Sequence, residues 1–455
     1  MVGSYSPDVF SELLPVYYKR LFPYEPFYRW LSYGPDNTNT FANREMSFTL
    51  PGDVYIRYQS FDTIKDFEQE VQKKCPEKID IGAVYNAKPK HNRMVSCFEV
   101  EEKELVFDID MTDYDKVRTC CSGADICIKC WHLITIATTI IDTALRDDFG
   151  FEHRLWVFSG RRGVHCWVCD QTARVLTPNQ RAHVAEYLQV LQNEDSNCKT
   201  ARIPPEKMHP SIRRAVDIIA KDFVEVCVKG QNILGSVTGM KTVLKMLGDD
   251  SLRQLTEAAW EALPTDSQTS VDRWNALVAV LDKQQSNLKR WQRYLLEEIM
   301  LHFAYPRLDI EVSKGANHLL KSPFCVHPKT GKVCVPFNPL ASRKFDPTAV
   351  PTLSDLIEEI QKFDAEKVKA GEEMYRKIKD YKKTSMYKGM QIFEEFLRNL
   401  EESWKSKKVK EEGMKIIFYL GSQNYNRSNI HAFHNFFFQK WSFRKGVRCR
   451  FSLES

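Results

Sequence analysis

The stretch Leu105–Asp113, LVFDIDMTD, has the pattern of a buried β-strand that two carboxylates interrupt. Successive side chains of a strand point to opposite faces, so Asp108 and Asp110 share one face while Phe107 and Ile109 share the other. Two carboxylates about 6–7 Å apart repel each other unless a cation lies between them or one takes up a proton. The stretch therefore predicts a core strand that carries either a metal site or ordinary surface acids at its end.

Similar strands surround this stretch. Apolar runs predict strands in MSFTL, DVYIRYQSF, KIDIGAVY and RLWVFSG between about residues 40 and 170, with one helix at 133–147. From about 176 to 300, apolar residues recur at i, i+3 and i+4, which is typical of helices. We therefore expect a mixed α/β (α+β) fold with an inserted helical subdomain.

The chain divides into four expected parts. Residues 1–175 and 301–410 form the two halves of the α/β domain, and residues 176–300 form the inserted helical subdomain. Within the second half, charged residues with sparse apolar ones over 353–414 predict exposed helices or a linker. The last forty residues hold ten aromatics and six Lys or Arg against one acid. Residues 411–455 are expected to be a divergent tail, although basic-aromatic interleaving can also bind single-stranded nucleic acid.

Composition describes a globular chain. It has 455 residues, 43% of them hydrophobic, and its 65 Lys and Arg against 60 Asp and Glu leave a charge of only +5. Any site for a polyanion must therefore be local. The N-terminus lacks the features of a signal peptide and predicts a helix from Pro7 with Ser6 as N-cap, and no segment predicts a transmembrane span. The 13 cysteines are then expected to be reduced or metal-bound, in cytosol or nucleus.

A third carboxylate follows far along the chain. In PRLDIEVS, residues 306–313, alternation predicts a strand that carries Asp309 on one face. If this strand pairs with the first, Asp309 joins Asp108 and Asp110. Carboxylate oxygens are the ligands preferred by Mg²⁺ and Mn²⁺, which keep positions open for phosphate oxygens. Such a site suits two-metal phosphoryl or nucleotidyl transfer.

Two further segments offer groups that bind phosphate. Ser159–His165, SGRRGVH, follows an apolar strand and combines glycines, which let the backbone approach a ligand, with two arginines. His318–Pro323, HLLKSP, begins nine residues after Asp309, and His327 follows it. Each segment alone also fits a basic surface turn. Beside a metal site, both predict contacts with a triphosphate.

Four cysteines are spaced as metal ligands: Cys120, Cys121, Cys127 and Cys130. The Cys-x2-Cys pair is a common half of a tetrahedral zinc site, whereas the adjacent pair is less usual. Four thiolates close the coordination shell. The cluster therefore predicts structural zinc at 120–130, with chance clustering as the alternative.

Four motifs closely resemble, in the same order, those of the small catalytic subunits of eukaryotic DNA primases, within the archaeo-eukaryotic primase family: DIDMTDYD, CCSGADICIKC, SGRRGVHCWVCD and LDIEVSKGANHLLKSPFCVHPKTG. YYKRLFPYEPFYRWLSYG and KIDIGAVY agree as well. The resemblance runs from about residue 6 to about 405 and fails beyond about 411. It implies the primase catalytic fold, with a mainly antiparallel sheet, an inserted helical subdomain and a structural zinc knuckle.

The resemblance also implies roles for individual residues. Asp108, Asp110 and Asp309 would hold the catalytic Mg²⁺ or Mn²⁺ ions, and Glu45 would be catalytic together with the first two. The four cysteines match the structural zinc ligands of the family. The nucleotide site would comprise Ser159, Gly160, Arg161, Arg162, Gly163, Val164, His165, His318, Leu319, Leu320, Lys321 and His327, with Arg57 and Asp80 nearby.

The activity implied is template-directed synthesis of short RNA primers de novo on single-stranded DNA. A 3′-hydroxyl would attack the α-phosphate of a ribonucleoside triphosphate, while Arg161, Arg162, His165, Lys321 and His327 neutralise the triphosphate. The implied partners are a large iron–sulfur primase subunit, the catalytic and accessory subunits of DNA polymerase α, the DNA template and the RNA primer. No membrane is implied, and the expected location is the nucleus.

Two alternatives remain open from the residues themselves. DIDMT, residues 108–112, also fits the Asp-x-Asp-x-Thr motif of haloacid-dehalogenase-type phosphatases, whose first aspartate is a covalent nucleophile. That class leaves the arginine loop and the cysteines unexplained. Another acidic pair, Asp249 and Asp250, follows apolar residues at helical spacing, whereas the phosphatase motif requires the end of a strand. The second alternative is a zinc-stabilised nucleic-acid-binding subunit without catalysis, against which the presence of all three aspartates argues.

Overall fold

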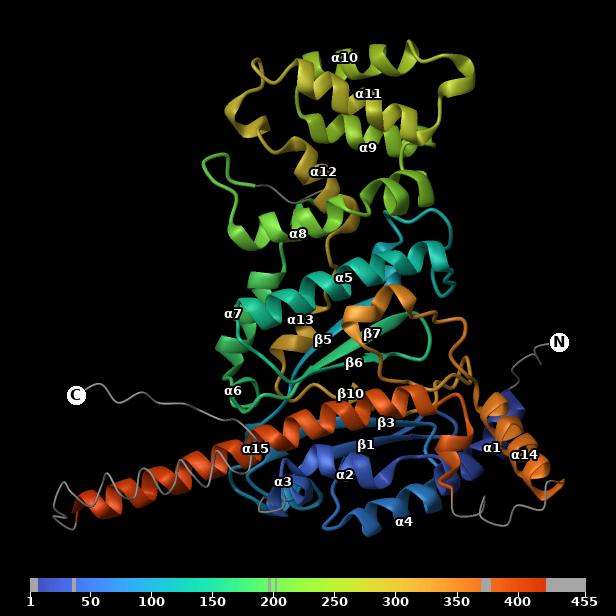
Figure 1. Ribbon diagram of the computed structural model, residues 1–455, viewed down its shortest axis with the longest axis vertical. Coiled ribbons are helices and arrows are strands. Elements are labelled where there is room, and N and C mark those ends of the chain that lie inside the picture. Colours follow the sequence, from blue (N-terminus) through green and yellow to red (C-terminus); the bar gives the residue numbers. More distant parts are fainter. Residues whose placement is uncertain (1–6, 35–37, 195–197, 201–202, 370–377, 423–455) are drawn as a thin grey trace, which may run out of the picture. The chain divides into compact units, whose positions relative to one another are not determined.

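Two antiparallel sheets form the centre of the protein (Figure 1). The structure is a computed structural model, which describes residues 7–34, 38–194, 198–200, 203–369 and 378–422. The first sheet has the order β10-β3-β1-β2, with β4 paired to β3, and the second has the order β5-β7-β6. All of these pairs are antiparallel, which confirms the mainly antiparallel α+β fold. The strands are β1 (Arg44–Leu50), β2 (Val54–Gln59), β3 (Lys78–Tyr85), β4 (Val100–Glu102), β5 (Leu105–Asp110), β6 (Arg154–Phe158), β7 (Gly163–Val168) and β10 (Leu320–Lys321).

Helices near the N-terminus cover the apolar face of the first sheet. Phe48 of β1 and Phe67 of α4 are fully buried, with ring centroids 6.5 Å apart. The polar residues of the same strands, Ser47 and Asp80 among them, consequently face the other side. The helices of this part are α1 (Pro7–Arg20), α2 (Tyr24–Ser32), α3 (Thr38–Ala42) and α4 (Ile64–Lys74).

Helix α5 (Ile128–Asp147) packs on the second sheet. Trp131 meets Phe158 of β6 edge to face, with ring centroids 5.7 Å apart, and Asp142 accepts a hydrogen bond from the Trp156 indole at 2.9 Å. The helix is long and apolar enough to cross a membrane, but 72% of its apolar 18-residue stretch is buried inside the protein. Its apolar residues therefore serve the core that holds β5, β6 and β7.

The helical part of the chain follows β7. It contains α6 (Gln171–Arg174), α7 (Pro178–Leu188), α8 (Pro210–Ala220), a π-helix (Val224–Gly230), α9 (Val237–Leu247), α10 (Asp250–Glu261), α11 (Ser270–Lys283) and α12 (Leu295–Ala304), with a small hairpin of β8 (Gln192–Glu194) and β9 (Cys198–Thr200). Helices α10 and α11 pack on each other, as do α12 and α8. The helical pattern expected over 176–300 is thus present in the described residues.

One local expectation was wrong. Residues 306–313 do not form a strand, because Asp309 is the N-cap of the short helix α13 (Ile310–Lys314) and its side chain accepts a hydrogen bond from the Glu311 amide at 3.2 Å. The segment after it contains β10, which pairs with β3. Alternation of polar and apolar residues cannot distinguish a strand from one capped helical turn, because the cap satisfies the first amide groups.

The C-terminal segment contains α14 (Leu353–Lys369) and α15 (Tyr387–Ser422), which favours helices over a linker as the meaning of the charged pattern over 353–414. The chain divides into two compact units, Met1–Arg398 and Asn399–Ser455, and everything described below lies in the first. Most of the predicted tail, residues 423–455, and the predicted N-cap Ser6 lie outside the described residues.

A buried ion pair joins the two sheets. Arg44 begins β1 and binds Glu104, just before β5, through two hydrogen bonds of 2.9 Å, and neither side chain is exposed. The Tyr33 hydroxyl donates to the same carboxylate at 2.5 Å. Burial alone would raise the pKa of Glu104, but Arg44 and Tyr33 lower that pKa to about 2. The carboxylate is therefore ionised at the junction of the sheets.

Arg44→Met is expected to destabilise the protein strongly. The change leaves Glu104 as a buried charge without its partner, which typically costs about 3–5 kcal/mol of the free energy of unfolding. Because the folded pKa lies below the unfolded value of about 4.3, the carboxylate stabilises fully above that pH, and the effect is lost as pH falls towards 2. Urea unfolding of both proteins between pH 3 and 7 measures this.

Lys229→Met is the matched control, since Lys229 pairs with Glu225 on the surface, where both side chains are more than 60% exposed. It is expected to change the stability by less than about 0.5 kcal/mol. Equal losses in the two variants would contradict a special role for the buried pair.

Candidate active site

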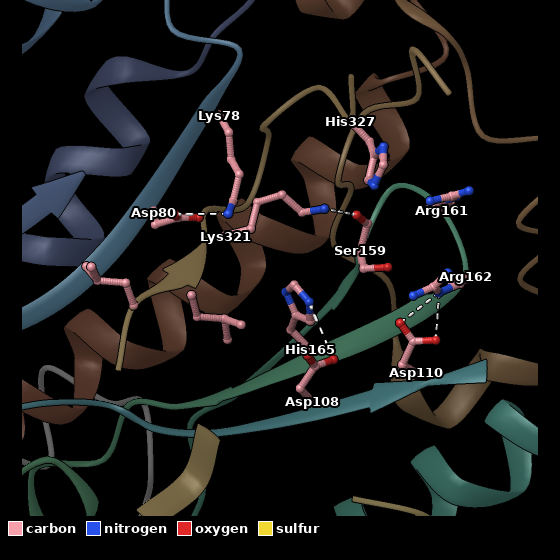
Figure 2. A pocket seen from close by; sticks show the side chains of 12 residues that line it. Lys78, Asp80, Asp108, Asp110, Ser159, Arg161, Arg162, His165, Lys321 and His327 are labelled. Atoms are coloured by element: carbon pink, nitrogen blue, oxygen red, sulfur yellow. Dashed lines mark hydrogen bonds and ion pairs between the residues drawn. The ribbon is translucent and has the colours of Figure 1, made fainter. Parts of the chain in front are cut away.

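A cavity of about 250 Å³ opens where the polar face of the first sheet meets β5 and β7 (Figure 2). Its walls come from β3 and β10 on one side, and from β5, β7 and the β6–β7 turn on the other. The lining residues are Lys78, Asp80, Asp108, Asp110, Ser159, Arg161, Arg162, His165, Leu319, Leu320, Lys321 and His327. Eleven of these twelve are candidates from the sequence, and Lys78 is the exception.

Strand β5 presents its two acids to the cavity, as alternation predicted. Asp108 lies opposite His165 of β7, and His165 Nε2 is 3.6 Å from Asp108 Oδ1. Asp110 accepts hydrogen bonds from the Arg162 Nε at 2.8 and 2.9 Å and from the Thr112 amide at 2.8 Å. These donors fix the orientation of the Asp110 carboxylate towards the β6–β7 turn.

Asp309 lies beside these acids, but not through pairing of two strands. Its amide donates to the Asp108 carbonyl at 3.2 Å, and the Ser313 hydroxyl of α13 donates to the Val106 carbonyl at 2.7 Å. The start of α13 is thereby attached to the edge of β5. The three carboxylates come together through the helix cap and these two backbone contacts.

The pKa of Asp108 is raised by its burial near other acids. Burial, followed by the charges of Asp110 and Asp309, raises that pKa to about 7. A divalent cation would relieve this repulsion, and carboxylate oxygens are its usual ligands, so the residues fit Mg²⁺ or Mn²⁺. The three carboxylates do not converge on one point here; in the described part of the chain, only the four cysteines form such a converging cluster.

The turn Ser159–Gly163 is clamped at two carbonyl groups. The Lys321 ammonium donates to the Ser159 carbonyl, and the Thr330 hydroxyl donates to the Gly160 carbonyl at 2.7 Å. Gly160 has φ +86°, and a Cβ there would lie 2.7 Å from the His327 side chain. Only glycine suits this position, where the turn carrying the two arginines passes against the segment around His327.

Two histidines of the cavity differ from the expectation that they neutralise a triphosphate. Burial and the nearby Lys321 lower the pKa of His165 and of His327 to about 3 each. Both rings are therefore neutral near pH 7 and offer hydrogen bonds without a positive charge. The positive charge of the cavity comes from Arg161, Arg162 and Lys321, with Lys78 in addition.

Lys78 is a lining residue that sequence reasoning missed. Its ammonium lies 3.1 Å from the Asp80 carboxylate, two residues along β3 on the same face. The same alternation that placed Asp108 and Asp110 together could have found it. Among the other candidates, Val164 is fully buried on the opposite face of β7 from His165, so only its backbone belongs to this region.

Glu45, Arg57 and His318 do not line the cavity. Glu45 is fully buried, and its carboxylate accepts hydrogen bonds from Arg57 Nε at 3.0 Å, from the Tyr58 amide at 3.2 Å and from the Tyr85 hydroxyl at 3.1 Å. The backbone of His318 accepts a hydrogen bond from the Lys103 ammonium at 2.7 Å, and its side chain is exposed. Glu45 and Arg57 thus form an ion pair on the same sheet face, further along the strands.

The four cysteines gather just before α5. The Sγ atoms of Cys120, Cys121, Cys127 and Cys130 all lie within 4.8 Å of one another. Inside the loop, Arg118 donates to the carbonyls of Gly123 and Asp125 at 2.9 and 2.8 Å. The loop is thus organised around Arg118, and its thiols fit a tetrahedral zinc ion.

Comparisons with known proteins agree with this geometry. A family model described as DNA primase small subunit matches residues 107–339. A Drosophila melanogaster DNA primase small subunit is 48% identical over 419 residues, which are 89% of this chain and 94% of that protein. The small subunit of Schizosaccharomyces pombe is 42% identical over 79% of this chain and 80% of its own length. That of Saccharomyces cerevisiae is 38% identical over 77% and 86%. The chain therefore belongs to the DNA primase small subunit family.

Proposed function

We propose that the chain is the catalytic subunit of a DNA primase, which makes short RNA primers de novo on single-stranded DNA by nucleotidyl transfer. One observation carries this proposal: Asp108 and Asp110 line a cavity together with Arg161 and Lys321, and Asp309 lies close enough for its charge to raise the pKa of Asp108. Acids that suit divalent cations thus lie beside cations that suit a polyphosphate. Family membership supports the same activity.

The residues divide the chemistry between them. Asp108, Asp110 and Asp309 would hold Mg²⁺ or Mn²⁺, which when bound stabilises the attacking and leaving oxygens of an in-line displacement. Arg161 and Lys321 bind the phosphates and stabilise the negative charge that develops on departing pyrophosphate. His165 and His327 donate hydrogen bonds as neutral rings. No side chain of the chain needs to form a covalent intermediate.

The two alternatives have less support. The phosphatase motif requires a nucleophilic Asp108, but it gives no role to the clamped arginine turn. The acidic pair at Asp249 and Asp250 begins α10, with Asp249 as N-cap, and so is not a second site of that kind. A subunit without catalysis would not require all three carboxylates beside a cationic cavity.

The proposal also includes a zinc ion and partner subunits. The four cysteines would hold one zinc ion that stabilises the loop before α5. The chain would act with a large iron–sulfur subunit, and with DNA polymerase α and its accessory subunit, in the nucleus. The description "small subunit" supports a larger partner, whereas the identity of the partners and the location rest on the family resemblance.

Asp108→Asn and Asp110→Asn are expected to reduce ribonucleotide incorporation at least 1,000-fold while the protein stays folded. Each change removes a metal-ligand charge that the transition state requires. Incorporation of labelled ribonucleotides on a poly-pyrimidine single strand, in Mg²⁺ or Mn²⁺, measures the effect, and circular dichroism checks the fold.

Glu101→Gln, at an exposed acid of β4, is the control and should incorporate normally. Unchanged synthesis by either aspartate variant would exclude the proposed site. Release of phosphate from a small phosphomonoester, with phosphate bound covalently to Asp108, would instead favour the phosphatase alternative.

Purified protein is expected to contain about one zinc per chain. Cys130→Ser should lose it, because three thiolates bind zinc more weakly, and should unfold at a lower temperature. Elemental analysis and thermal unfolding measure the two effects. Cys227→Ser, a buried cysteine outside the cluster, should keep the metal. A folded protein without zinc, or with iron, would contradict the assignment.

A further inference from the structure

A β-bulge interrupts strand β2 beside the cavity. Met46 of β1 pairs with Gln59 and Phe48 pairs with Ile56, so Arg57 and Tyr58 together face the single residue Ser47. Tyr58 has φ +57°, in the left-handed region that a bulky side chain rarely adopts. Bulges of this kind redirect side chains and are common next to active sites, where such strain is retained.

Glu45 holds the bulge in place. Its buried carboxylate accepts hydrogen bonds from Arg57 Nε and Nη2, at 3.0 and 3.2 Å, and from the Tyr58 amide at 3.2 Å. A carboxylate that binds both residues of the bulge compensates for the unfavourable backbone conformation. Glu45 thus acts as a positioning residue for Arg57 and Tyr58.

An aromatic surface results on the same side of the sheet. Tyr85 and Phe98 stack with ring centroids 4.1 Å apart and an angle of 7°, and the Tyr58 ring meets Phe98 edge to face at 6.3 Å. Tyr58 is 37% exposed, and the Arg57 guanidinium lies 5.0 Å from the centre of its ring. Tyr58 and the half-buried Phe98, which we call the aromatic ledge, are therefore accessible to a ligand, and the buried Tyr85 stacks on Phe98.

The aromatic ledge continues the wall of the cavity. Tyr55, on the same strand as Tyr58, hydrogen-bonds to the Ser47 hydroxyl at 2.9 Å, and its own hydroxyl is 3.5 Å from Asp80, which lines the cavity. Three residues of a strand span about 10 Å, or about three stacked nucleotides. A strand of nucleic acid with one nucleotide in the cavity can therefore reach the aromatic ledge.

The charge beside the aromatic ledge suits a phosphate backbone. The 3₁₀ turn Pro89–Met94 packs against β2 and carries Lys90, His91 and Arg93 without an acid. Arg93 is exposed, and Lys90 shares the carboxylate of Asp62 with Lys88. Exposed aromatic rings next to basic side chains are the usual means of binding single strands without sequence preference.

We propose that the aromatic ledge stacks on a nucleobase of the single strand next to the nucleotide in the cavity. The proposal rests on the proposed function, since it assumes that the cavity holds a nucleotide. The base would lie against the Tyr58 ring, with Phe98 at its edge and the phosphate near Arg57 and the turn Pro89–Met94. Either the template or the growing primer could supply this base.

Tyr58→Asn tests the aromatic ledge without a risk to the fold. Asparagine tolerates the left-handed conformation better than tyrosine, so the change removes the ring and relieves backbone strain. We expect the full-length chain to bind a primed single-stranded oligonucleotide about 5- to 100-fold more weakly, as measured by fluorescence anisotropy, with unchanged thermal stability or a small gain. Tyr58→Phe, which keeps the ring, should bind normally.

Substitution of 2-aminopurine, a base whose fluorescence is quenched by stacking, identifies the strand. The probe is placed in the template at positions next to the templating base or, in separate substrates, at the 3′ end of the primer. We expect the fluorescence of the probe to be quenched at one of these positions, and Tyr58→Asn to abolish this quenching. The position of the quenched probe shows whether the template or the primer supplies the base. Tyr187→Asn, at a tyrosine of α7 that is 38% exposed, should leave both affinity and quenching unchanged.

Equal affinity and equal quenching for Tyr58→Asn and the unmodified chain would overturn the proposal. So would a drop in the thermal stability of Tyr58→Asn with no change in binding, since the rings would then only pack the sheet. If the unmodified chain incorporates ribonucleotides but its binding does not depend on Tyr58, only the aromatic ledge is wrong. If it incorporates none, the proposed function itself fails.

Discussion

The ion pair between Arg44 and Glu104 sits where the two sheets join, and no water reaches either side chain. Removing two charges from water is costly, so the pair persists only because its geometry is nearly ideal and Tyr33 adds a third hydrogen bond. Buried pairs of this kind add little net stability, but they penalise every arrangement that separates the partners. The spacing of β1 and β5 is thereby restricted, and the cavity lies between the sheets to which these strands belong.

Lys103, next to Glu104, extends this restriction to the cavity. Its buried ammonium donates to the Ile81 carbonyl of β3 at 3.2 Å and to the His318 carbonyl at 2.7 Å. Burial lowers the pKa of Lys103 to about 7, against the opposing effect of Glu104. Strand β10 has only two residues, so backbone pairing alone holds it weakly. The Lys103 contacts fix the chain just before Lys321, whose ammonium clamps the turn at Ser159.

The sequence predicted those parts of the site that depend on local periodicity. Asp108 and Asp110 share a face because a strand alternates, and the same rule could have identified Lys78 beside Asp80. Asp309 was placed near them for the wrong reason. Its position depends on a helix cap and on a hydrogen bond to a residue about 200 positions earlier in the chain, and no local pattern encodes such a contact.

The same limit applies to charge and conformation. The protonation of His165 depends on how deeply β7 is buried and on the distance to Lys321, which only the fold determines. The left-handed conformation of Tyr58 depends on the bulge, where two residues of β2 lie opposite a single residue of β1. Core strands and helices, by contrast, were predicted because their apolar residues repeat at the period of each element.

The balance of charge in the cavity explains why its acids and its basic groups are useful only together. Burial, followed by the charges of Asp110 and Asp309, raises the pKa of Asp108 to about 7, so the acids favour the entry of a cation. Among the basic groups, Lys321 is directed at a carbonyl group, and in the described part of the chain Arg161 makes no ion pair. Neither histidine adds a charge. A cation alone would leave the basic groups uncompensated, and a polyphosphate alone would meet the acids. Both sets of charges are satisfied when a cation and a polyphosphate enter together, which is the condition for transferring a nucleotide.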